Sequence, residues 1–154
     1  MVKFCGHYIA CQEVPDEISL VFSISNCPYR CLGCHSPWLQ SDIGDELTKA
    51  DIQYYVNQYK DGITCVCFMG TGGDYAKIAD FVDYVKEVCK LKTCVYTGDD
   101  EPRFLENSSP DYFKYGSYDP FVGGLDCSTT NQHMLKLIGN TYVDITEWFW
   151  RKKE

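Results

Sequence analysis

The sequence lacks several features that would assign it to a particular class of protein. Its longest apolar runs, such as residues 63–69, fall far short of the about 20 residues that a membrane-spanning helix needs. It also lacks an excess of positive charge, because 14 Lys and Arg stand against 22 Asp and Glu, for a formal net charge of −8. Nucleic-acid binders normally carry a basic patch. We therefore expect neither membrane insertion nor nucleic-acid binding.

Signals for export and for a division into domains are also missing. The first residues contain no apolar segment of the signal-peptide type, and no repeat, linker or low-complexity tract interrupts the chain. A chain of 154 residues suits one domain with a single core. We expect one domain over residues 1–154, a cytoplasmic location, and a solvated basic tail at 151–153. In a reducing cytosol, the ten cysteines would serve metal binding or catalysis rather than disulfides.

Segments typical of strands and of helices alternate along the chain. The apolar and β-branched runs predict strands at 18–25, 63–69, 93–96, 112–115 and 141–145. Apolar residues at helical spacing predict helices at 48–60 and 74–90. Thr48 and Asp51 fit an N-terminal capping pair for the first helix, and Asp74 fits the N-cap of the second. Such alternation favours an α/β fold built from βαβ units with a parallel sheet.

Three cysteines follow the first predicted strand in a C-x3-C-x2-C pattern. They are Cys27, Cys31 and Cys34, and they supply three thiolates from one tight loop. Thiolates are soft ligands that favour iron–sulfur clusters or zinc. A cubane of four irons that is held by three cysteines leaves one iron without a protein ligand. That iron would be free to bind a substrate or cofactor.

Two further candidate motifs follow the next predicted strands. A glycine-rich run at 70–74 follows the second strand, and Thr97 and Gly98 follow the third. Because functional loops of parallel sheets gather at the carboxyl ends of the strands, we expect both motifs to lie beside the cysteine loop. The glycine run can be a tight turn capped by Asp74, or it can expose backbone groups to a ligand. Thr97 can be a turn former or a contact for the ribose of a ligand.

The remaining cysteines do not form a recognisable ligand pattern. Free cysteine packs as a small hydrophobic residue, and we expect this role for Cys65, Cys67, Cys89 and Cys94. The roles of Cys5, Cys11 and Cys127 stay open. Trp148, Phe149 and Trp150 form an apolar cluster that is more typical of a core or an oligomer contact than of a ligand site.

Four stretches carry a resemblance to a known family. The cysteine pattern resembles the cluster motif of radical S-adenosylmethionine (SAM) enzymes, and residues 72–74 resemble the glycine-rich motif after their second strand. More narrowly, the chain resembles the activating protein of the anaerobic (class III) ribonucleotide reductase. The stretches lie at 31–37, 72–74, 95–98, and 115–118 with 124–125 and 129–132.

This resemblance implies a fold, two cofactors and a set of site residues. The fold would be a small open partial (βα) barrel of parallel strands. Cys27, Cys31 and Cys34 would hold a [4Fe–4S] cluster, and SAM would chelate its fourth iron. The residues at the SAM site would be Gly33, Cys34, His35, Gly72, Gly73, Asp74 and Thr97. This chain departs from the motifs of the superfamily at two positions. Gly33 stands where an aromatic residue is common, and Asp74 stands where Glu is commoner. Because Asp is shorter than Glu, SAM would contact the glycine motif through backbone groups of Gly72 and Gly73 or through the shorter carboxylate.

The resemblance also implies an activity and partners. An electron from the cluster would cleave SAM to methionine and a 5′-deoxyadenosyl radical, which would remove a hydrogen from a glycine of the anaerobic ribonucleotide reductase. The electron would come from a donor such as flavodoxin or ferredoxin, and a homodimer is compatible with the sequence.

Two other interpretations stay open. The first is a zinc-stabilised binding module, in which His35 or a further cysteine completes the site. Structural zinc sites usually draw two ligand pairs from separate parts of a chain, and no second pair stands out here. The second is another small radical SAM enzyme, acting on a free metabolite or as the activase of another glycyl-radical enzyme.

Overall fold

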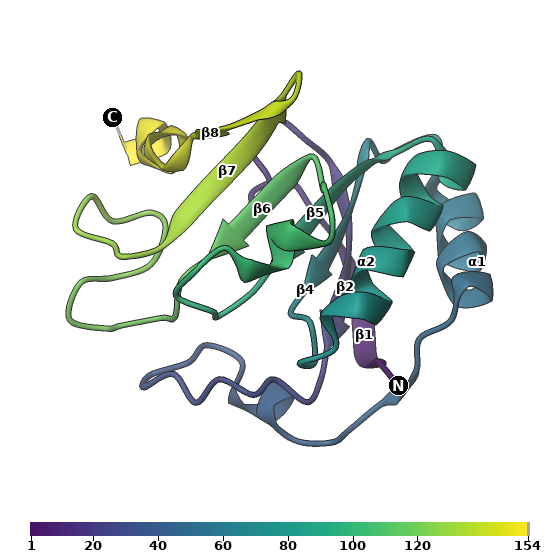
Figure 1. The fold of residues 1–154 in the computed structure, drawn as a ribbon, viewed down its shortest axis with the longest axis horizontal. Helices are drawn as coiled ribbons and strands as arrows, with labels where there is room; N and C mark the ends of the chain where they lie inside the picture. Colours follow the sequence, from purple (N-terminus) through teal and green to yellow (C-terminus); the bar gives the residue numbers. More distant parts are fainter. Residues whose placement is uncertain (154) are drawn as a thin grey trace.

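The structure is a computed structural model that describes residues 1–153, and residues 1–150 with their side chains. The basic side chains at 151–153, expected to be solvated, therefore lie outside the described part. One mixed sheet runs through the molecule in the spatial order β3-β1-β2-β4-β5-β6-β7-β8 (Figure 1). Its strands are β1 (Lys3–Ala10), β2 (Ser19–Ile24), β3 (Asp45–Glu46), β4 (Cys65–Met69), β5 (Lys92–Tyr96), β6 (Tyr112–Tyr115), β7 (His133–Ile138) and β8 (Thr141–Asp144).

Two α-helices and several short turns of other helix types accompany the sheet. The α-helices are α1 (Lys49–Tyr59) and α2 (Tyr75–Tyr84), and a π-helical turn η2 (Val85–Cys89) extends the second. The 3₁₀ turns are η1 (Pro37–Gln40), η3 (Arg103–Glu106) and η4 (Thr146–Lys153). Figure 1 shows α1 and α2 together on one side of the sheet. No helix within the described residues has the length and apolar character needed to cross a membrane.

The predicted partial barrel of parallel strands is wrong. Only β2, β4, β5 and β6 pair in parallel, whereas β1 and β3 on one side and β7 and β8 on the other pair antiparallel. The predicted last strand belongs to this second group, because β7 and β8 form a hairpin closed by Gly139 and Asn140, with Gly139 at φ +64°. With two α-helices and antiparallel strands on both flanks, the sheet is open and mixed.

Local predictions agree with the structure more closely. Thr48 and Asp51 form the predicted capping box of α1, in which each side chain accepts a hydrogen bond from the other residue's backbone N–H. Asp74 is the N-cap of α2, and its carboxylate accepts the backbone N–H of Lys77. These caps fix where both helices begin, and the second holds α2 directly after the glycine-rich run.

Apolar residues are buried on both faces of the sheet. On one face, side chains of β2, β4 and β5 pack against the apolar faces of α1 and α2, around Phe22, Phe68 and Phe81. On the other face, the connection before β2 and the turn η4 cover a second cluster. Its buried members are Val14, Val21, Cys65, Cys67, Cys94, Tyr112, Met134 and Ile145.

The cysteines expected to pack as hydrophobic residues do so. Cys65, Cys67 and Cys94 are fully buried in the second cluster, and Cys89 packs at the edge of the first. Trp148 and Phe149 pack against the second cluster, as expected of a core contribution. Cys5 and Cys11 are exposed, and no ligand role follows from their positions.

Candidate functional site

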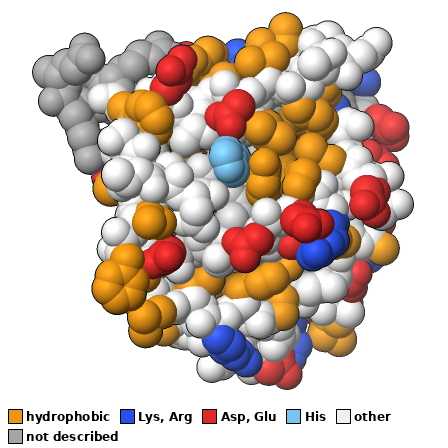
Figure 2. All heavy atoms as spheres, turned by 60° about the vertical axis from the view of Figure 1, so that its left-hand side comes forward, with side chains coloured by type: hydrophobic (Ala, Val, Ile, Leu, Met, Phe, Trp, Pro, Cys, Tyr) orange, Lys and Arg blue, Asp and Glu red, His pale blue; other side chains and the backbone are white. Residues whose placement is uncertain are grey.

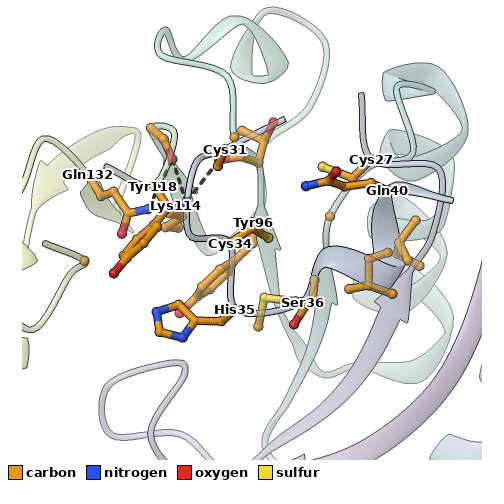
Figure 3. Close-up of a pocket in the computed structure, with 18 of the residues that line it drawn as sticks. Cys27, Cys31, Cys34, His35, Ser36, Gln40, Tyr96, Lys114, Tyr118 and Gln132 are labelled. Carbon is orange, nitrogen blue, oxygen red and sulfur yellow. Dashed lines mark hydrogen bonds between the residues drawn. The ribbon is translucent and has the colours of Figure 1, made fainter. Parts of the chain in front are cut away.

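A cavity of about 280 Å³ lies at the carboxyl ends of the parallel strands. The loops that follow β2, β4, β5 and β6 all contribute to its wall, as the shared edge of neighbouring parallel strands requires (Figure 3). Its lining includes the three motif cysteines together with Ile24, His35, Ser36, Leu39, Gln40, Met69, Gly70, Tyr96, Thr97, Gly98, Lys114, Gly116, Tyr118, Gly124, Leu125 and Gln132. The volume is slightly below the range of about 300–1,000 Å³ typical of small-ligand sites.

Backbone hydrogen bonds close the cysteine loop at its base. The N–H of Asn26 donates to the carbonyl of Ser41 at 3.1 Å, and the N–H of Cys27 donates to the carbonyl of Leu39 at 2.9 Å. Inside the loop, Arg30 Nη1 donates to the carbonyl of Gln40 at 3.0 Å. Residues 26–41 therefore form a closed loop, which limits the conformations open to the cysteines within it.

The three motif cysteines are half-buried and all face the cavity. In the view of Figure 3, Cys27 lies beside Gln40 at one side, and Cys31 and Cys34 lie nearer the centre. Burial raises the pKa of the Cys27 thiol, a hydrogen bond with the backbone of Tyr29 opposes this rise, and the nearby Cys31 and Cys34 add to it. The three thiols thus line one cavity within reach of each other's charge.

A tight turn between Cys31 and Cys34 explains the glycine before the third cysteine. The N–H of Cys34 donates to the carbonyl of Cys31 at 3.2 Å, and Gly33 has φ +71°, where an L side chain is strained. A Cβ at Gly33 would also lie 3.4 Å from the ring of Tyr118. Any residue with a side chain at position 33 would strain the backbone of this turn.

His35 follows the turn and also lines the cavity. Its ring packs edge-on against the ring of Tyr118, with centroids 4.9 Å apart. Tyr118 comes from the loop after β6, so this contact joins the cysteine loop to the opposite wall.

The predicted glycine motif lies beneath the cysteine loop. Gly72 and Gly73 have φ +61° and +76°, and a Cβ at Gly72 would lie 3.1 Å from the carbonyl of Ser25, where the cysteine loop begins. Asp74 caps α2 and lies 3.6 Å from the amino group of Met1. Gly70 lines the cavity, whereas these three residues do not. Their contact with SAM stays a prediction.

A hydrogen-bonded chain connects the cysteine loop to the sheet edge, and we call Tyr29, Tyr75 and Asp99 the tyrosine latch. The hydroxyl oxygens of Tyr29 and Tyr75 are 2.9 Å apart, and the Tyr75 hydroxyl donates to Asp99 Oδ2 at 3.1 Å. The ring of Tyr29 packs on Gly98 so closely that a Cβ there would lie 2.9 Å from it. The latch joins the cysteine loop, α2 and the end of β5.

Thr97 lies in the cavity wall next to this latch. Its side chain is buried, and its hydroxyl accepts the backbone N–H of Asp99 at 3.2 Å and lies 3.4 Å from the hydroxyl of Tyr75. The local contacts of the Thr97 hydroxyl are thus those of a turn former. Its predicted contact with a ribose stays a prediction.

Lys114 is a site residue that the sequence interpretation missed. It comes from β6, is only 8 % exposed, and donates to the carbonyls of Gly116 at 2.7 Å and Thr97 at 3.3 Å (Figure 3). Burial lowers the pKa of its ammonium group to about 8, and the three cysteines, first Cys31, act against the fall. Strand alternation could have indicated it, because Lys114 shares a face with Tyr112 and is the one charged residue in that predicted strand.

Within the fourth stretch of the resemblance, residues 115–118 pack against residues 129–132. Gly116 lets the backbone of Gln132 approach, since a Cβ at Gly116 would lie 2.9 Å from the Cα of Gln132. Gln132 Nε2 donates to the carbonyl of Gly116 at 3.4 Å, and Asn131 Nδ2 donates to the carbonyl of Ser117 at 3.1 Å. Gln132 is therefore held in the cavity wall by its own neighbours.

The donor set can be compared with two kinds of metal group. Within the described residues, no three His, Cys, Asp or Glu side chains are arranged to hold a single metal ion. A cubane differs from a single ion because each cysteine binds a different iron, so its ligands need not converge on one point. Three thiols from one closed loop, facing one cavity, fit a cluster that takes three protein ligands.

A comparison with protein-family models, curated proteins and solved structures found no match.

Proposed function

We propose that this protein is a radical SAM activase that generates the glycyl radical of an anaerobic ribonucleoside-triphosphate reductase. The observation that carries the proposal is the meeting of three half-buried thiols, Gly70 and Thr97 in one cavity at the carboxyl ends of parallel strands. The resemblance of the four sequence stretches supports it, because three of them contribute residues to the cavity wall and the remaining one, at 72–74, lies next to the start of the cysteine loop.

In this proposal, Cys27, Cys31 and Cys34 would hold a [4Fe–4S] cluster, and the cavity would take SAM. When bound, the cluster would pass on one electron from a donor such as flavodoxin or ferredoxin. This electron would split SAM into methionine and a 5′-deoxyadenosyl radical able to take a hydrogen from glycine. The closed loop holds the thiols in place, and the tyrosine latch fixes the loop against the sheet. Leu39, Ile24 and Met69 contribute apolar side chains to the cavity wall.

The test is anaerobic reconstitution followed by product analysis. Iron and sulfide are added to the purified protein, and the product after dithionite and SAM is measured by chromatography. We expect 5′-deoxyadenosine from the wild type and none above background from Cys31→Ala. The matched control is Cys5→Ala, because Cys5 is exposed and outside the cavity. Absence of the product from the wild type, or equal yields from both variants, would contradict the proposal.

Metal analysis of the same samples separates the zinc alternative. A structural zinc site would give colourless protein with one zinc per chain and no sulfide, whereas the proposed activase gives brown protein with iron and sulfide. Addition of the reductase then tests the partner, since a glycyl radical detected by electron paramagnetic resonance (EPR) on the reductase requires transfer of the radical.

A further inference from the structure

A groove runs along the outer side of the cysteine loop, and we call it the loop groove. It has a volume of about 790 Å³ and lies between Pro28–Leu32 of the cysteine loop and the loops at 98–103 and 117–121. Cys31, Gly98 and Tyr118 line both this groove and the cavity. A ligand in the loop groove would therefore lie directly against the wall that contains a motif cysteine.

Two very exposed apolar side chains line the loop groove. Phe121 is 88 % exposed and Leu32 is 69 % exposed, and beyond Met1 they are the most exposed large apolar side chains in the described part of the chain. Large apolar side chains that project from a surface beside a groove are typical anchors of protein–protein contacts. Leu32 and Phe121 come from loops that are far apart in sequence, and both line the same groove.

Hydrogen bonds order the turn that carries Phe121. The carboxylate of Asp119 accepts the backbone N–H of Phe121 at 2.9 Å, and the carbonyl of Asp119 accepts the N–H of Gly123 at 2.8 Å. Because the turn is already ordered, contact with a partner costs less conformational entropy than it would for a free loop.

The charge of the loop groove favours one class of ligand. Its lining contains four carboxylates and two guanidinium groups, namely those of Asp99, Asp100, Glu101, Asp119, Arg30 and Arg103. Arg103 is already engaged by Asp99 at 2.7 Å and by Glu101 at 3.3 Å. Figure 2, which brings this side of the molecule forward, shows apolar patches and acidic side chains that are more widespread than basic ones. The groove would repel a phosphate and attract a cation.

We propose that the loop groove binds an extended protein segment that bears a Lys or Arg side chain next to its reactive glycine. Phe121 and Leu32 contact the apolar part of this segment, and the exposed carboxylate of Asp100 faces its cation. This inference rests on the proposed function, because it assigns the route by which the protein substrate reaches the cavity.

The test uses two synthetic peptides that differ at one position, Lys or Glu beside a central glycine, in anisotropy titrations against the reconstituted protein. We expect the Lys peptide to bind at least about tenfold more tightly, and to lose affinity as salt is raised. Phe121→Ala should weaken binding of the Lys peptide by about tenfold. Asp100→Asn should weaken it by a few-fold, and because Asn keeps an acceptor for the N–H of Ser117, this variant removes the charge without breaking that hydrogen bond. The control is Ile138→Ala, because Ile138 is 53 % exposed and lies on β7.

The outcomes separate this inference from the proposed function. Formation of 5′-deoxyadenosine without peptide should be the same in Phe121→Ala and the wild type, because Phe121 does not line the cavity. Equal binding of the two peptides, no binding of either, or no effect of Phe121→Ala would overturn the groove assignment while SAM cleavage persists. Loss of SAM cleavage from the wild type would instead count against the proposed function.

Discussion

Lys114 is the residue whose placement is least expected on physical grounds. A buried ammonium group loses hydration, and two backbone carbonyls replace only part of it. Because burial lowers its pKa to about 8, the folded chain holds this proton less tightly than the unfolded chain does. The lysine therefore lowers the stability of the fold at neutral pH, which is typical of a group kept for a function.

The first prediction concerns Lys114→Met. We expect the free energy of unfolding at pH 7 to rise by about 1–3 kcal/mol, because the cost of burying a charge is removed. Between pH 8 and 10.5 the wild type gains stability as Lys114 deprotonates in the folded state first, so the difference between the two proteins should shrink with pH. Urea unfolding at several pH values measures this. The exposed Lys60→Met is the control, and a pH-independent difference would contradict the prediction.

At the scale of elements, the tyrosine latch joins three segments that the sequence keeps far apart. Tyr29 is in the cysteine loop, Tyr75 begins α2, and Asp99 follows β5. Gly98 permits the close packing of Tyr29. The latch thus restrains the cysteine loop, which has little regular secondary structure, by hydrogen bonds to α2 and to the residues after β5.

The second prediction concerns Tyr75→Phe, which removes the central hydroxyl of the latch. We expect faster hydrogen exchange at the amides of residues 27–34 and a lower iron content after reconstitution, with a loss of global stability of only about 1 kcal/mol. Tyr54→Phe is the control, because Tyr54 is 65 % exposed on α1. Unchanged exchange in the cysteine loop would show that the latch does not hold it.

A third prediction concerns Glu17, which joins the segment before β2 to two strands. Its carboxylate accepts Lys92 Nζ and the Tyr112 hydroxyl, both at 2.9 Å. Burial raises its pKa, but hydrogen bonds from Thr64, Lys92 and Tyr112 outweigh this effect and leave the pKa below the usual 4.5.

Glu17 therefore stabilises the fold above pH 4.5, and this contribution is lost as the pH falls through the lowered pKa. We expect Glu17→Gln to cost about 1–3 kcal/mol at pH 7 and progressively less in acid. Thermal unfolding from pH 7 to pH 3 measures this, with the exposed Glu106→Gln as control. A cost that stays constant down to pH 3 would contradict the assignment.

Sequence patterns predicted the elements whose signals are local. Apolar runs marked the four parallel strands, and the capping residues Thr48 and Asp74 marked both helix starts. Strand β1 was missed because its side chains are only partly buried and Gly6, at φ +150°, interrupts its pattern near a bulge. Strand β7 was missed because it follows a polar loop. Without these strands, the antiparallel flanks and hence the open mixed sheet could not be predicted.

At the scale of the whole molecule, the sequence predicted which motifs meet at the carboxyl ends of the parallel strands, but it did not predict the opposite wall of the cavity. Parallel pairing of β2, β4 and β5 brings the cysteine loop, the glycine turn and Thr97 to one edge, as expected. The contributions of Lys114, Tyr118 and Gln132 depend on β6 and on the long loop after it. Tertiary packing alone decides where these residues lie.

The central claim is that one closed loop supplies three thiolates to a four-iron cluster and leaves one iron for SAM. Mössbauer spectroscopy of protein reconstituted with ⁵⁷Fe, before and after addition of SAM, tests it most directly. The account predicts that one iron in each cluster changes its isomer shift when SAM is added, while the other irons do not. A cluster whose irons all stay unchanged with SAM, or a protein that retains no iron, would contradict it.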